Sequence, residues 1–118
     1  MAIEVAWINF TPGAVPVINA GKRIASVGRN GVGDYSVNLT DDLVSATVAG
    51  VADLLGILPF ATMGGIAAIP AQANLRHIQC EVVSRREIRI RTNNFAAAAD
   101  DPAEISMYVH ADLLPIGE

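Results

Sequence analysis

The stretch that decides the fold is residues 26–39, which read SVGRNGVGDYSVNL. Near its centre, Asn30, Gly31 and Gly33 belong to the residue types that tolerate positive φ, as tight turns between strands require. From Asp34 onward the residues alternate between apolar and polar, which is the period of a half-buried strand. The stretch therefore predicts a β-hairpin whose loop is longer than two residues, with a β-bulge near Gly33.

Strand-like alternation continues on both sides of this hairpin. In residues 2–10, AIEVAWINF, it predicts that Ile3, Val5 and Trp7 share one face, with Trp7 as an aromatic anchor. The other predicted apolar faces are Tyr35, Val37 and Leu39; Ile78, Cys80 and Val82; Ile88 and Ile90; and Ile105, Met107 and Val109. About seven to nine short strands separated by turn residues predict an all-β fold, an antiparallel β-sandwich or open barrel, as a single β-domain over residues 1–118.

The middle of the chain departs from this pattern. Residues 48–70, VAGVADLLGILPFATMGGIAAIP, carry a single charge, on Asp53. Their length approaches the ~20 apolar residues of a membrane span, but two prolines and four glycines interrupt them, so we expect no span. We predict one long apolar loop, with a helical turn near residues 52–58, that is buried in an oligomer or docking interface. The predicted interface residues are Leu54, Leu55, Leu58, Phe60 and Ile66.

The composition points to a chain that is partly covered by another protein. Only 17% of the 118 residues are charged, against 52% hydrophobic, so some surface is expected to be buried against a neighbour. The net charge of −4 gives no general attraction to nucleic acid or to anionic lipid, and neither is an expected partner. A single cysteine forms no disulfide within the chain, and the first residues lack the layout of a secretory signal. We expect synthesis in a reducing cytoplasm.

The candidate chemistry is sparse. Cys80 with His77, and serines with His110, are the combinations that could supply a nucleophile and a base, but alternation puts Cys80 on the apolar side of its strand. The two histidines lack metal-ligand spacing, and the acidic pairs 41–42 and 100–101 lack the spacing of a calcium loop. We predict no catalytic residue, no metal and no cofactor, and therefore a protein that is not an enzyme.

Basic residues cluster in one third of the chain. Five of the eight lie between Arg76 and Arg91, with Arg89 and Arg91 on an outward face. Either this face meets an acidic partner, or it is solvated and pairs with Glu81 and Glu87. Nucleic acid is the weakest of the alternatives, because stacking aromatic residues are scarce.

The N-terminal third resembles a module that recurs in small structural proteins of tailed bacteriophages. The likeness is carried by the opening AWINF (residues 6–10) and by the hairpin residues Ser26-Val27, Asn30-Gly31, Gly33-Asp34-Tyr35 and Val37-Asn38-Leu39. Residues 101–111 are loosely similar to the closing strand of the module. The resemblance implies a β-domain of a tail fibre, appendage or other virion surface protein, commonly trimeric. It also implies structural roles for Trp7, Asn30, Gly31, Gly33 and Tyr35.

Together these features predict a non-enzymatic virion structural protein, assembled in the bacterial host cytoplasm. It acts either as a head decoration (cement) protein or as a tail-fibre or appendage component. The expected partners are further copies of itself, most simply in a trimer, and other virion proteins such as major capsid or tail proteins. The apolar stretch 48–70 replaces a polar loop of the module, which favours packing on a shell or on other copies. The alternative is a carbohydrate- or peptide-binding accessory β-domain.

Overall fold

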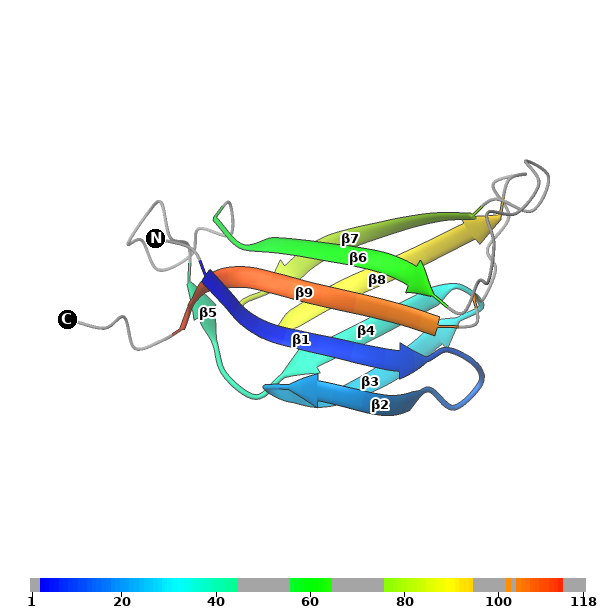
Figure 1. Ribbon diagram of the computed structural model, residues 1–118, viewed down its shortest axis with the longest axis horizontal. Helices are drawn as coiled ribbons and strands as arrows, with labels where there is room; N and C mark the ends of the chain where they lie inside the picture. Colours follow the sequence, from blue (N-terminus) through cyan, green and yellow to red (C-terminus); the bar gives the residue numbers. More distant parts are fainter. Residues whose placement is uncertain (1–2, 45–55, 65–75, 95–101, 103, 114–118) are drawn as a thin grey trace.

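The chain forms a β-sandwich of two antiparallel sheets, as predicted (Figure 1). The computed structural model describes residues 3–44, 56–64, 76–94, 102 and 104–113. Sheet A contains β2 (Val17–Lys22), β1 (Ile3–Thr11), β9 (Glu104–Leu113) and β6 (Leu58–Gly64) in that order, and the short β5 (Leu43–Val44) also pairs with β9. Sheet B contains β3 (Ile24–Gly31), β4 (Asp34–Leu39), β8 (Glu87–Asn94) and β7 (Arg76–Ser84) in that order. The described residues contain no helix.

One hydrophobic core lies between the sheets. The predicted inward faces of β4, β8 and β9 are all fully buried in it, and those of β7 pack against its margin. Tyr35 is the largest fully buried side chain, and its ring packs edge-on against Phe10 with centroids 5.4 Å apart. Its hydroxyl oxygen accepts a hydrogen bond of 3.0 Å from the backbone N–H of Gly13. The hydroxyl of Tyr35 is therefore hydrogen-bonded although its ring lies in the core.

A β-bulge in β1 overturns the predicted placement of Trp7. Glu4 lies opposite His110 and Ala6 opposite Val109, so Val5 is an extra residue in the ladder. Val5 and Ala6 are both buried, and the alternation resumes one residue out of phase. Trp7 is therefore half-buried on the outer side of sheet A, and the prediction that it shares a face with Val5 is wrong.

The apolar middle segment is not simply a loop. Residues 58–64 form β6, which pairs with β9 from Leu58 opposite His110 to Gly64 opposite Glu104. Pro59 is accommodated because β6 is an edge strand, where one side of the backbone needs no ladder partner. The predictions for residues 48–55 and 65–70, including most of the predicted helical turn, lie outside the described residues.

The hairpin between β3 and β4 is present, with a tighter turn than predicted. Gly31 lies opposite Asp34, so only residues 32–33 form the turn, and the predicted longer loop is wrong. The bulge falls at Asn30, where the ladder steps from Arg29–Tyr35 to Gly31–Asp34. Gly33 has a φ of 65°, whereas Asn30 and Gly31 do not adopt positive φ.

We expect Gly33→Ala to lower the free energy of unfolding by about 1–2 kcal/mol, because a Cβ is disfavoured at this φ. Gly28→Ala is the matched control within the same hairpin, since Gly28 lacks positive φ and a Cβ built there meets no atom within 4 Å. Urea denaturation of both variants measures the difference. Equal stability of the two variants would contradict the turn geometry.

Candidate interaction surfaces

The outer surface of sheet A, here called face A, presents apolar side chains to solvent. Leu58, Phe60 and Tyr108 are 46%, 55% and 40% exposed. Across the sheet, Phe60 on β6 lies opposite Tyr108 on β9, and Tyr108 lies opposite Trp7 on β1. We call these three residues the aromatic row. Phe60 also packs edge-on against His110, with ring centroids 5.4 Å apart.

A row of amide and hydroxyl groups runs beside the aromatic row. Asn9 Nδ2 donates to Ser106 Oγ at 2.9 Å, which links β1 to β9. Asn19, at a bulge in β2, donates to Asn9 Oδ1 at 2.9 Å and to Thr11 Oγ1 at 3.1 Å. These bonds tie three strands together on the outside of the sheet. Face A is therefore an ordered surface that combines aromatic rings with polar groups.

The predicted interface residues are partly on this face. Leu58 and Phe60 lie on β6 and are exposed, as an interface in an assembly would require. Leu54, Leu55 and Ile66 lie outside the described residues. The sequence prediction did not include Trp7 and Tyr108 in the surface. The outward position of Tyr108 was visible in its alternation with Met107 and Val109, but its neighbours across the sheet depend on the strand order.

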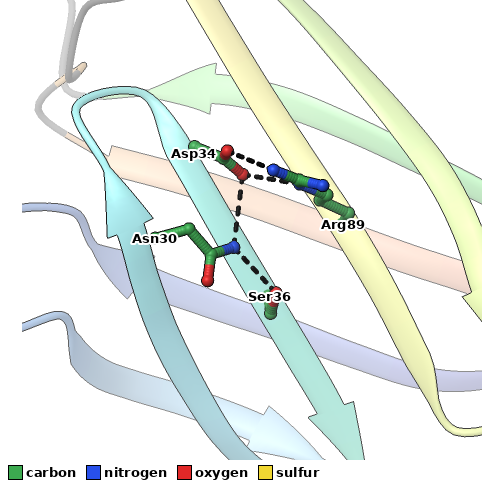
Figure 2. Close-up of polar contacts among 4 residues, drawn as sticks. All are labelled: Asn30, Asp34, Ser36 and Arg89. Atoms are coloured by element: carbon green, nitrogen blue, oxygen red, sulfur yellow. Dashed lines mark hydrogen bonds and ion pairs between the residues drawn. The ribbon is translucent and has the colours of Figure 1, made fainter.

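The outer surface of sheet B, here called face B, is polar and centred on one ion pair. Arg89 Nε and Nη2 donate to Asp34 Oδ1 and Oδ2 at 2.8 and 2.5 Å, a bidentate arrangement. Asn30 Nδ2 donates to Asp34 Oδ1 at 3.3 Å and to Ser36 Oγ at 2.9 Å, and Figure 2 shows the four side chains together. The close ion pair of Arg89 is with Asp34, which β4 brings within reach of the guanidinium and which the sequence did not predict; the predicted neighbours Glu81 and Glu87 act on Arg89 through their charge.

This network favours the charged form of Asp34. The hydrogen bond from Arg89 is the main cause, and burial, which comes second, opposes it; the hydrogen bond from Asn30 and the charges of Arg89 and Arg91 also lower the pKa. The pKa of Asp34 falls from an ordinary value of 3.8 to about 2. Because the folded-state pKa is lower than the unfolded one, the resulting stabilisation is complete above about pH 4 and is lost as the pH falls toward 2.

We expect Asp34→Asn to lower the free energy of unfolding by about 1 kcal/mol at pH 7, a modest value because both partners are partly solvated. Near pH 2 the deficit relative to the wild type should become much smaller, since the wild-type carboxyl is then about half neutral in the folded protein and almost fully neutral in the unfolded chain. Asp41→Asn is the control, because its contact with Arg23 is longer, at 3.5 Å, and more exposed. Urea midpoints at both pH values measure the effect. An equal deficit at pH 7 and pH 2 would show that the ion pair is not its cause.

A groove of about 440 Å³ opens on face B toward the edge strand β7. Gln79, Cys80, Glu81, Arg89 and Arg91 line it. Gln79 lies opposite Arg91 and Glu81 opposite Arg89 in the register of β7 and β8. The groove therefore places hydrogen-bond donors of Arg89, Arg91 and Gln79 near the carboxylate of Glu81, on two adjacent strands.

The candidate catalytic pairs are not assembled in the described residues. Cys80 packs against the core margin, and burial raises the pKa of its thiol to about 11, so it is protonated at neutral pH. His77 is exposed, on the opposite side of the strand from Cys80, and the His110 ring packs against Phe60.

Both members of the acidic pair 41–42 form ion pairs within the chain. Asp41 contacts Arg23, and Asp42 accepts a hydrogen bond of 2.7 Å from Arg86 Nε. Asp100 and Asp101 lie outside the described residues. Among the side chains that the structure describes, no group of three or more His, Cys, Asp or Glu is placed to hold a metal ion. Within the same ranges, no helix has the length and apolar character needed to cross a bilayer.

Comparison of the chain with protein families, with curated proteins and with solved structures found no match.

Proposed function

We propose that the chain is a non-enzymatic structural protein of a tailed-bacteriophage particle that self-associates through face A. The aromatic row and Leu58 are the observation that supports self-association. Aromatic and apolar side chains held on an ordered sheet are typical of the buried centre of protein interfaces. The bacteriophage assignment rests on the sequence resemblance of the N-terminal third.

The expected energy of such an association is substantial. Complete burial of a large apolar side chain contributes about 1.5–3 kcal/mol, and Leu58, Phe60 and Tyr108 each have about half of that surface still to lose. A three-fold assembly buries these groups in every copy. The polar row of Asn9, Asn19 and Ser106 is held by bonds within the chain and can border such an interface without losing its partners.

The virion assignment is tested on particles. An antibody raised against the chain, applied to particles purified from a culture of the host that carries the gene, should place immunogold label on the particle surface. Label on the head would assign a decoration protein, and label on the tail a fibre or appendage component. Recovery of the chain only in the soluble fraction, with no label on intact particles, would contradict the proposal.

A second candidate is carbohydrate binding on the same face. Aromatic rings next to amide and hydroxyl groups are also the chemistry that stacks on sugar rings and bonds their hydroxyls. Trp7 is the single tryptophan, so its fluorescence reports on face A directly. A saturable change on titration with a neutral oligosaccharide would favour this candidate over self-association.

A further inference from the structure

We propose that the groove on face B binds an extended polypeptide segment of a partner protein that carries an acidic and a basic side chain two residues apart. This inference is independent of the proposed self-association, because the residues that line the groove lie on β7 and β8 of sheet B, whereas face A belongs to sheet A. It does not depend on the virion assignment either, because peptide binding in the groove requires no particular particle.

The groove contains exposed charged groups that form no close ion pair with another described residue, although the charges of Arg91 and Glu81 act on Asp34 and Arg89. The side chains of Gln79, Glu81 and Arg91 are exposed and make no hydrogen bond or ion pair with another described residue. Arg89, in contrast, is held by Asp34 and is fixed as part of the wall. A ligand in the groove therefore meets one available cation, one available anion and one amide.

The opposite signs of these charges select the class of ligand. A nucleic acid or an anionic glycan carries charge of one sign and would meet repulsion from Glu81. A polypeptide can present both signs, with a carboxylate toward Arg91 and an ammonium or guanidinium toward Glu81. Gln79 can then bond a main-chain or side-chain amide of the same segment.

The spacing of the charges matches an extended chain. Arg91 and Glu81 are diagonal neighbours on adjacent strands, a relation that places the two residues roughly 7–8 Å apart. Side chains on one face of an extended segment recur every two residues, about 6.8 Å. An acidic and a basic residue separated by one residue therefore reach both groups at once.

The test is a nuclear magnetic resonance titration of the full ¹⁵N-labelled chain with capped hexapeptides. The probe TEVKVT carries both charges, and the controls TEVEVT and TKVKVT carry one sign each. We expect amide shifts concentrated on β7 and β8, and an affinity for TEVKVT about three- to tenfold higher than for either control, the gain of two partly exposed ion pairs.

Variants of the groove should change this preference in a defined direction. Arg91→Glu leaves two negative groups, so its preferred probe should become TKVKVT; Glu81→Lys leaves positive groups, so its preferred probe should become TEVEVT. A dispersed spectrum of each variant shows that it is folded. Equal affinity for all three peptides, or shifts located on face A, would overturn the proposal. Saturating shifts of β7 and β8 with an oligogalacturonate would also overturn it, in favour of an anionic glycan.

Discussion

Replacing Tyr35 by alanine is expected to lower the free energy of unfolding by about 3–5 kcal/mol, the largest effect of any single substitution considered. The side chain is fully buried, packs edge-on against Phe10 and leaves a large cavity when removed. For a domain of this size, such a loss is a large fraction of the total stability. Urea denaturation followed by circular dichroism measures it.

The variant Tyr35→Phe distinguishes the contribution of the ring to stability from that of the hydroxyl. It should cost only about 1 kcal/mol, because it keeps the packing but removes the acceptor for the Gly13 N–H. If Tyr35→Ala were as mild as Tyr35→Phe, the ring would not lie in the core and the assignment of the inner face of β4 would be wrong.

The second large effect is on assembly. We expect the double variant Leu58→Asp, Phe60→Asp to lose self-association completely while it keeps its fold. Both side chains are about half exposed in the single chain, so aspartate is solvated there, whereas in an interface it would be a buried, unpaired charge. Circular dichroism tests the fold, and light scattering tests the mass.

Val32→Asp is the control for this variant. Val32 is 51% exposed, comparable to Phe60, but lies in the turn between β3 and β4 of sheet B, not on face A. It should retain the wild-type mass. A double variant with wild-type mass would show that face A is not the interface, and an unfolded one would show that Leu58 and Phe60 stabilise the single chain.

Strands with one buried face were predictable from the sequence. In β4, β8 and β9, strict alternation identified the inward residues, because each strand is regular and half-buried. Alternation did not predict two other features of the fold. The bulge at Val5 depends on how β1 meets β9, and β6 combines Pro59 with apolar residues on both faces, so neither shows a local period of two.

The candidate surfaces were predictable only in part. Leu58 and Phe60 were chosen because their segment is apolar, and the outward direction of Arg89 and Arg91 followed from alternation. Which strands lie side by side is a non-local property. The sequence pattern therefore revealed neither the pairing of Arg89 with Asp34, nor the alignment of Trp7 with Tyr108 and Phe60, nor the groove beside Gln79.

The most direct test of self-association is the molar mass of the wild-type chain by light scattering between about 1 and 100 µM. The proposal predicts a single species of three times the 12.4 kDa chain mass that persists on dilution across this range. A homogeneous 12.4 kDa species at the highest concentration would contradict it, and would show that face A is exposed in the free protein for another ligand.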